Sequence, residues 1–278
     1  MSENNKKVLN ECISFHELTN ALKKMKIGKS PGPDGIIVEF YKLYWDIIGQ
    51  DLFDVFIGCH KSSKLTYSQY MALIILLYKK GAREDIRNWR PISLSNSDIK
   101  ILSKLLAERL KIVLPEIIDS EQSGCVKGRR IGHSIRLIND LFDNLDDQGL
   151  MLITDKMKAF DMVEWEWLFF VLNRFGFGDY FIGWIVIMYQ GMKSAVMTNG
   201  FVSKYFNLTR SIRQGDPLSA LLYIIQAEPL AECIRQAKNI KGIDIFCDNR
   251  VIGEIRGSQY VDDSTNMLRN CDYIENLS

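Results

Sequence analysis

Two adjacent aspartates, Asp262 and Asp263, are the residues whose type and spacing most clearly predict chemistry. They follow Tyr260 and a strand-like segment at 251–255. Two carboxylates held about 4 Å apart repel each other by roughly 4 kcal/mol at an effective dielectric of about 20. A bound cation offsets this repulsion, so the pair predicts a metal site at a β-hairpin tip, with Asp262 as the ligand and Asp263 as its partner. An ordinary turn, in which Asp is common, is the alternative for these residues alone.

A third carboxylate, Asp155, ends the short apolar segment 150–154, which predicts a strand. If this strand neighbours the hairpin, Asp155 and Asp262 lie at one end of a sheet, where two divalent ions can bind. A pair of metal ions stabilises the attacking and leaving oxygens of a displacement at phosphorus. Oxygen ligands favour Mg²⁺, with Mn²⁺ as the alternative ion. Asp161 has a competing explanation, because Asp161 and Glu164 can cap the following helix.

Cationic side chains gather in three glycine-containing loops. These loops contain Lys79, Arg83, Arg87 and Arg90; Lys127, Arg129 and Arg130; and Arg213, Gln214 and Gly215. Loops rich in arginine and backbone N–H groups bind phosphate, and the third loop precedes a helix that Asp216 and Pro217 are expected to start. The loops therefore predict contacts with a triphosphate and with a nucleic-acid backbone. A solvated charged loop is the alternative for the first of them.

The composition is that of a globular protein, with 47% hydrophobic and 25% charged residues among 278. The net charge of +1 gives no global signal for nucleic acid. The six cysteines lack the spacing and the companion histidines of a zinc site and favour a reduced, intracellular setting, whether nucleus or cytoplasm. No apolar run reaches the roughly 18 to 20 residues of a membrane span, so no membrane partner is expected.

The periodicity of apolar residues predicts a mixed α+β fold. Helices are expected at about 15–25, 37–57, 97–114, 131–145, 165–172, 180–189 and from 217 onward, and strands near 71, 150, 195, 205, 245 and 251. The segment at 70–78 is expected to be a buried strand, and Asn199-Gly200 predicts a two-residue hairpin turn. Pro115 is expected to close its helix, and Pro229 to kink or break the last one.

Taken together, the motifs resemble the fingers and palm of a reverse transcriptase of the non-LTR retrotransposon (LINE) type. They follow the family's order and cover nearly the whole chain. The matching stretches are Ser30–Gly35 with Glu39–Tyr41, Trp89–Leu94, Gln122–Gly124 with Lys127–Arg130, Asp155 with Lys158–Asp161, Arg213–Ser219 and Tyr260–Asp263.

The resemblance implies an RNA-directed DNA polymerase that extends a DNA primer with dNTPs on an RNA template. It implies that Asp155 and Asp262 coordinate two Mg²⁺ ions, that the backbone carbonyl of Lys156 assists, and that Asp263 completes the acidic cluster. Phe160 is expected to lie under the incoming sugar and to exclude a 2′-hydroxyl; core packing is the alternative for a lone Phe.

The same resemblance assigns the remaining site residues. Triphosphate contacts are expected from Lys79 and Arg90, nucleotide and template contacts from Gln214 and Gly215, a primer-end contact from Tyr260, and further primer or template contacts from Lys127, Arg129, Arg130 and Arg213.

The implied architecture is a right-hand polymerase. Residues 1–60 are expected to form an N-terminal helical extension and part of the fingers, residues 61–147 the fingers, and residues 148–278 an incomplete palm with an antiparallel sheet packed on helices. Because the sequence ends soon after Asp263, we expect the thumb to be absent and processive synthesis to be weak or lacking.

Two rival functions stay open at this point. An RNA-dependent RNA polymerase shares the acidic palm, although Phe160 argues against it. An inactive remnant that only binds nucleic acid is the other. Departures from the usual family pattern at Cys125 and at Lys156-Met157 remove no expected ligand. The oligomeric state is left open.

Overall fold

The computed structural model describes residues 1–143, 150–238, 240–247 and 250–269. Its contacts divide the chain into two compact units. Unit 1 comprises residues 1–113 and 160–219, and unit 2 comprises residues 114–159 and 220–278. Both units mix helices with strands, which confirms the predicted α+β class.

Unit 1 is mainly helical and has one mixed sheet. Its elements are α1 (Glu3–Asn10), α2 (Phe15–Lys23), α3 (Val38–Ser62), α4 (Tyr67–Tyr70), β1 (Met71–Tyr78), the short 3-10 helix Ile86–Asn88, β2 (Trp89–Ser95), most of α5 (Ser97–Ile117), α7 (Trp165–Arg174), α8 (Asp179–Tyr189), β4 (Lys193–Thr198), β5 (Phe201–Val202) and β6 (Phe206–Asn207). Unit 2 contains α6 (Ile131–Asp143), β3 (Leu150–Thr154), most of α9 (Ser219–Gln236), β7 (Ile243–Cys247), β8 (Arg250–Ile255), β9 (Gly257–Tyr260) and β10 (Asp263–Leu268).

The sheet of unit 1 has the strand order β2-β1-β4-β5, and β6 also pairs with β4. β1 runs antiparallel to β2 and parallel to β4. The hairpin between β4 and β5 turns at Asn199 and Gly200, both with positive φ, which confirms the sequence prediction. Ile75 pairs with Ile92 and Leu77 pairs with Arg90, so these four side chains share one face of the sheet.

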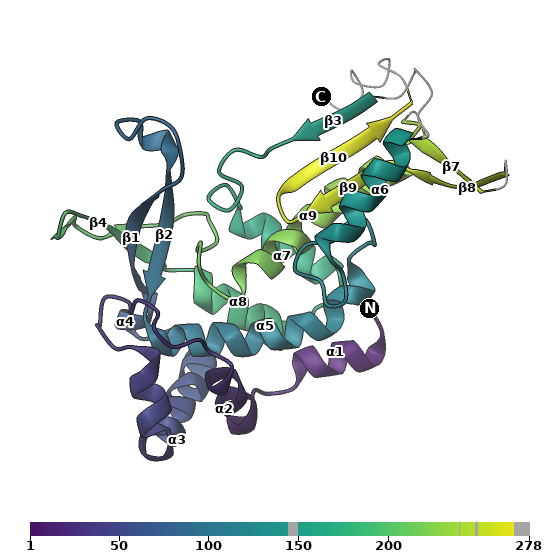
Figure 1. The fold of residues 1–278 in the computed structure, drawn as a ribbon. Coiled ribbons are helices and arrows are strands. Elements are labelled where there is room, and N and C mark those ends of the chain that lie inside the picture. The colour runs from purple at the N-terminus through teal and green to yellow at the C-terminus, as the bar shows by residue number, and fades with distance from the viewer. Residues whose placement is uncertain (144–149, 239, 248–249, 270–278) are drawn as a thin grey trace. The chain divides into compact units, whose positions relative to one another are not determined.

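The sheet of unit 2 that matters for the acidic residues is antiparallel, in the order β3-β10-β9. Thr154 pairs with Ser264, and Tyr260 pairs with Asp263. The predicted neighbours, strand 150–154 and the hairpin at Asp262, therefore do lie side by side. α6 runs along this sheet (Figure 1), and a small apolar cluster of Leu141, Ile255 and Met267 joins the helix to the strands.

The core of unit 1 forms around α5. Ile99, Leu102, Leu106 and Leu110 recur at helical spacing and are completely buried. On the same helix, Arg109 donates to the carboxylate of Glu17 from Nε at 2.7 Å and from Nη2 at 2.9 Å. This ties α5 to the start of α2, where Ser14 and Glu17 form a capping box.

Pro115 does not close its helix as predicted, and Pro229 does not break its helix. α5 continues past Pro115 to Ile117, and α9 continues past Pro229 to Gln236. An internal proline costs a helix about 3 kcal/mol, but buried neighbours such as Leu114 and Ala231 keep the flanking turns packed. Burial of the apolar face contributes more to helix stability than propensity does.

Other element predictions also need correction. α9 begins at Ser219 rather than at Pro217, because the Asp216 carboxylate accepts from the Leu218 N–H at 2.9 Å and closes a turn before the helix. Asp161 does not cap α7, whose N-cap is Glu164 without a side-chain cap bond.

β1 is largely half-buried rather than buried, and Leu77 is exposed. α3 ends five residues beyond the predicted Ile57, and Leu145 lies outside the described residues.

Among the described residues, no helix is both long and apolar enough to cross a membrane. This agrees with the short apolar runs of the sequence.

Candidate active site

Asp155, Asp262 and Asp263 all lie at strand ends of the unit 2 sheet: Asp155 directly follows β3, Asp262 is in the turn after β9, and Asp263 begins β10. Thr154 is the last paired residue of β3 and pairs with Ser264 of β10, so Asp155 and Asp263 each lie one residue beyond this pair. The pair is cross-linked, because the hydroxyls of Thr154 and Ser264 are hydrogen-bonded at 2.7 Å. The pairing of β3 with β10 therefore brings the strand ends that carry Asp155 and Asp263 to the same end of the sheet.

The third carboxylate, Asp262, lies in the two-residue turn between β9 and β10. The side chain of Gln122 supports this turn: its Oε1 accepts from the Val261 N–H at 2.9 Å, and its Nε2 donates to the Val261 carbonyl at 3.3 Å. Val261 has φ 58, an unfavourable left-handed conformation for a β-branched residue. A Cβ on Gly124 would lie 2.7 Å from Val261 Cγ2, so the turn packs directly on the backbone there.

Residues 121–123 extend this support by running beside β9. The Gln259 N–H donates to the Glu121 carbonyl and the Ser123 N–H donates to the Gln259 carbonyl, each at 2.9 Å. Sequence reasoning missed this role, because it considered this loop only for its cationic residues Lys127, Arg129 and Arg130. The uncharged, polar Gln122-Ser123 pair before Gly124 was the available signal, since buried polar side chains need partners.

Lys156 and Tyr223 lie near the Asp262 carboxylate. The Lys156 ammonium is 6.0 Å from the centre of the Tyr223 ring. Burial lowers the pKa of Lys156, and the negative charge of Asp262 partly restores it. Burial together with the Asp262 charge raises the pKa of Tyr223 to about 12. Asp262 thus has a cation and a neutral phenol as electrostatic neighbours.

The donor set at this sheet end suits a hard divalent ion. Asp155 and Asp263 are exposed and Asp262 is half-buried, so carboxylate oxygens are open to solvent. Within the part of the chain that the structure describes, no three His, Cys, Asp or Glu side chains are close enough to form a ready metal cluster. Carboxylate oxygens and a backbone carbonyl are nevertheless the ligand types that Mg²⁺ takes, often with water and substrate phosphate completing the shell.

The predicted nucleotide residues of unit 1 gather around β2. The Ser93 N–H donates to the Gln214 carbonyl at 3.1 Å. Gly215 has φ 97, and a Cβ there would lie 3.5 Å from Ile92 Cγ2. Arg90 is exposed and lies on the same face of the sheet as Ile92. Lys79 directly follows Tyr78, the last residue of β1, which pairs with Trp89. The register thus places Lys79, Arg90 and the Gln214-Gly215 loop on one side of the sheet.

Phe160 and Asp161 lie beside the same loop. The Ile212 N–H donates to the Phe160 carbonyl at 2.9 Å. The Gln214 side chain donates from Nε2 to Asp161 Oδ1 at 3.4 Å. Asp161 therefore positions a predicted nucleotide-binding residue, a role that its sequence position before a helix did not indicate.

Two charged residues, Arg213 and Asp216, hold the loop at 213–216 against the rest of unit 1. Arg213 is only 5% exposed and donates from Nη2 to the Tyr70 carbonyl at 2.9 Å. Asp216 Oδ1 accepts from the Ser103 hydroxyl of α5. Burial raises the pKa of Asp216 and lowers that of Arg213, while each charge partly stabilises the other. Arg213 thus points into unit 1 rather than toward solvent.

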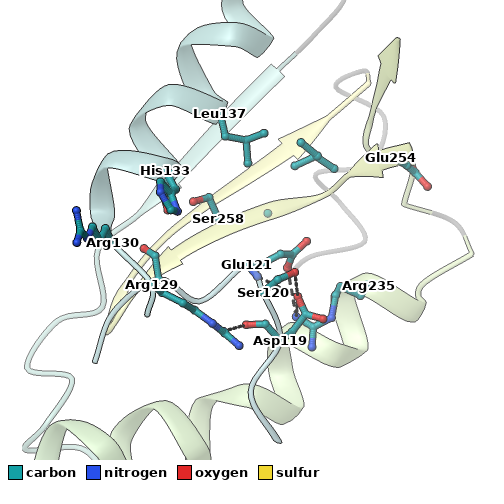
Figure 2. A pocket seen from close by; sticks show the side chains of 14 residues that line it. Asp119, Ser120, Glu121, Arg129, Arg130, His133, Leu137, Arg235, Glu254 and Ser258 are labelled. Carbon is teal, nitrogen blue, oxygen red and sulfur yellow. Dashed lines mark hydrogen bonds and ion pairs between the residues drawn. The ribbon is translucent and has the colours of Figure 1, made fainter. Parts of the chain in front are cut away.

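Unit 2 has a cavity of about 510 Å³ beside the loop of Arg129 and Arg130 (Figure 2). Arg129 lines it, but its guanidinium donates to the carbonyls of Ile118 at 2.8 Å and Gln122 at 2.9 Å, and also to that of Asp119. Arg130 and Lys127 are exposed. The sequence predicts phosphate contacts from Lys127, Arg129 and Arg130. Of these three residues, Arg129 instead holds the loop together through its hydrogen bonds to backbone carbonyls.

Comparison with known proteins gives the family. Residues 77–275 match the family model described as "Reverse transcriptase (RNA-dependent DNA polymerase)". The chain belongs to the reverse transcriptase family. The matched residues include the acidic sheet end and the loop at 213–216, so the resemblance to non-LTR retrotransposon polymerases seen in the sequence is confirmed.

Several relatives of this reverse transcriptase domain come from transposable elements. The chain is 38% identical to the "Transposon TX1 uncharacterized 149 kDa protein" of Xenopus laevis over 85% of its own length and 18% of the relative. It is 25% identical to the "Retrovirus-related Pol polyprotein from type-1 retrotransposable element R1" of Bradysia coprophila over 73% of the chain and 20% of the relative. It is 26% identical to the "Probable RNA-directed DNA polymerase from transposon BS" of Drosophila melanogaster over 76% of the chain and 23% of the relative. The chain thus spans about a fifth of the length of these curated relatives.

Proposed function

We propose that this chain carries the polymerase site of a retrotransposon reverse transcriptase and adds deoxynucleotides to a DNA primer on an RNA template. The observation that supports this most strongly is the β3–β10 register. In a chain of this family, Asp155 directly follows β3, and Asp262 and Asp263 lie where the neighbouring strand β10 begins.

In this proposal Asp155 and Asp262 bind the metal ions, the Lys156 carbonyl assists, and Asp263 adds negative charge. Two Mg²⁺ ions, or Mn²⁺ ions, would stabilise the attacking and leaving oxygens of the displacement. The primer 3′-oxygen attacks the α-phosphorus of a dNTP, the bond to the β-phosphate oxygen breaks, and pyrophosphate leaves.

The nucleotide and the nucleic acid are bound by the other predicted residues. Lys79 and Arg90 contact the triphosphate, Gln214 and Gly215 the base pair, and Phe160 excludes the 2′-hydroxyl. Tyr260, which is 43% exposed beside the acidic turn, contacts the primer end, while Lys127 and Arg130 contact the nucleic-acid backbone. The functional division into fingers up to residue 147 and palm from residue 148 belongs to the same proposal.

Arg129 and Arg213 receive different roles from those the family resemblance implies. The structure engages both guanidinium groups with backbone carbonyls of their own unit. We infer that they shape the loops that bind nucleic acid and nucleotide, rather than contacting either directly.

A primer-extension assay tests the proposal, with the 278-residue chain, an RNA template, a DNA primer, dNTPs and Mg²⁺. Asp262→Asn keeps the size of the side chain but removes its charge, and we expect single-nucleotide incorporation to fall at least about 1,000-fold, as loss of electrostatic stabilisation does in other enzymes. Asp244→Asn, an acidic change elsewhere in unit 2, serves as the matched control. An unchanged rate in Asp262→Asn would exclude the assigned metal site.

The same assay separates the rivals. Preferential incorporation of rNTPs over dNTPs would identify an RNA-dependent RNA polymerase instead. Template binding without any incorporation by the wild type, with either nucleotide and either metal, would identify an inactive nucleic-acid-binding remnant.

A further inference from the structure

Arg235, near the end of α9, is a largely buried cation that the proposed chemistry does not use. Its side chain is 17% exposed and, among the described residues, forms ion pairs with four carboxylates. These are Glu228 at 2.5 Å, Glu232 at 2.7 Å, Glu121 at 3.2 Å and Asp119 at 4.0 Å. Glu228 and Glu232 belong to α9 itself, whereas Asp119 and Glu121 come from the loop after α5 and face Arg235 in Figure 2. Arg235 therefore joins a helix to a loop.

The guanidinium of Arg235 balances charges that would otherwise repel one another. Glu228 is 5% exposed, and burial raises the pKa of Glu121 and of Glu228, while hydrogen bonds from Arg235 offset part of this rise. Removing one partner of a buried ion pair leaves the other charge uncompensated, which is strongly unfavourable. Without the cation, repulsion between the carboxylates should therefore move the loop at 119–122 away from α9.

The loop that this arginine holds also supports the acidic turn. The carbonyl of Glu121 accepts from the Gln259 N–H at 2.9 Å. The next residue, Gln122, accepts from the Val261 N–H at 2.9 Å through its side chain, and Asp262 directly follows Val261. A displacement of the loop would therefore reach the turn through two consecutive residues.

We propose that Arg235 is a positioning residue, which holds the loop at 119–122 against α9 and thereby fixes the turn that carries Asp262. The link runs from the Arg235 guanidinium to Glu121, and from Glu121 and Gln122 to the backbone of the turn. Arg235 and Glu121 are 114 residues apart, so no local sequence signal connects them. The inference rests on the proposed function only for the role of Asp262, since the link between the arginine and the turn exists without it.

Hydrogen exchange with mass spectrometry in EDTA tests this link without any polymerase activity. The peptide 257–263 contains two amide hydrogens that bond to Glu121 and Gln122. We expect both to exchange at least about tenfold faster in Arg235→Gln and in Glu121→Gln. Exchange in 150–154, on the far strand of the same sheet, should stay within twofold of wild type. The double variant R235Q/E121Q should exchange no faster than Arg235→Gln alone, because both changes interrupt the same path.

Glu232→Gln is the matched control, because it also removes a carboxylate from Arg235 but changes α9 rather than the loop. Its exchange at 257–263 should stay within twofold of wild type. Circular dichroism and thermal melting verify that each variant folds, and Glu121→Gln decides by itself if Arg235→Gln does not fold. Exchange at 257–263 within twofold of wild type in folded Glu121→Gln overturns the inference. Equal acceleration by Glu232→Gln, or equally fast exchange at 150–154, also overturns it, because either result indicates a general loss of stability.

Primer-extension kinetics test whether the position of the turn matters for the chemistry. In the single variants at Arg235 and Glu121 that fold, we expect kcat for single-nucleotide incorporation to fall about tenfold, with an unchanged KM for dNTP. Faster exchange at 257–263 together with a wild-type kcat overturns the positioning role. A wild type that does not extend the primer contradicts the proposed function instead, and the exchange result then decides the link between Arg235 and the turn.

Discussion

Gln122 shows how one uncharged side chain can control the position of a carboxylate that it does not touch. Its amide bonds to both polar groups of the Val261 backbone, and Asp262 is the next residue. Each such bond contributes about 1 kcal/mol, which is enough to bias a turn whose first residue is in a left-handed conformation. Gln122 is thus a positioning residue for the proposed metal site.

We predict that Gln122→Ala lowers kcat for single-nucleotide incorporation roughly tenfold, with little change in the KM for dNTP. The reason is that the metal ligands move while the nucleotide residues of unit 1 keep their contacts. Gln122→Glu keeps the acceptor for the Val261 N–H but loses the donor, so it should retain part of the activity. Gln50→Ala, an exposed change on α3, is the control. A folded Gln122→Ala protein with wild-type kcat would remove the positioning role.

At the level of elements, ion pairs of Glu108 connect α5 to the end of α2. Glu108 on α5 accepts from Lys24 at 2.5 Å, just after α2, and from Lys104 and Lys111 of its own helix at 3.0 and 2.9 Å. Partial burial raises the pKa of Glu108, but hydrogen bonds from the three lysines outweigh it and lower the pKa to about 2. The ionised carboxylate therefore stabilises the folded state.

The lowered pKa of Glu108 determines how the stability of the folded state depends on pH. The folded pKa lies below the unfolded value of 4.5, so the stabilisation is fully present above about pH 4.5 and is lost as the pH falls toward 2. We predict that Glu108→Gln destabilises the protein by about 1 kcal/mol at pH 7, an estimate reduced for solvent screening. Urea unfolding at pH 7 and at pH 3 measures the difference, which should shrink at the lower pH. Glu166→Gln, an exposed change on α7, should show no such difference; a constant effect of Glu108→Gln at both pH values would contradict the assignment.

Elements set by local chemistry were predictable from the sequence. Asn199-Gly200 specifies its hairpin and Ser14 with Glu17 specifies the start of α2, because both signals act over a few residues. The end of α5 and the continuity of α9 through Pro229 were not, since burial of neighbouring turns overrides the prolines. The strand that ends at Asp155 and the acidic hairpin were both predicted, and their pairing was inferred from the chemistry that it would permit.

Contacts between distant segments were the part of the site that the sequence could not show. Gln122 and Val261 are 139 residues apart, and Arg213 and Tyr70 are 143 apart. A single sequence gives the polarity of such residues but not their partners. Arg129 and Arg213 were assigned to nucleic acid for this reason, since an arginine in a glycine-containing loop looks the same whether it meets a phosphate or a carbonyl.

At the level of the whole molecule, the two halves of the proposed chemistry belong to different units. The proposed metal ligands Asp155 and Asp262 are in unit 2, while the proposed nucleotide contacts Lys79, Arg90 and the loop at 213–216 are in unit 1. Binding of metal and binding of nucleotide should therefore be separable events.

Hydrogen exchange with mass spectrometry checks this separation. We predict that Mg²⁺ alone slows exchange in 150–155 and 257–268, and that exchange in 77–90 and 213–216 slows only when dNTP is added, because a ligand stabilises the region that binds it. Asp262→Asn should abolish the first effect. Slower exchange at 77–90 with Mg²⁺ alone would show that the two events are coupled or that the metal binds elsewhere.

The close packing of Val261 on Gly124 limits the substitutions that these two positions can accept. Any side chain at 124 would overlap Val261, and a bulkier residue at 261 would press on the backbone of residue 124. Neither position can be enlarged by itself without displacing the aspartate that follows. Random mutagenesis selected for retained polymerase activity should therefore leave 124 as glycine and admit only small residues at 261.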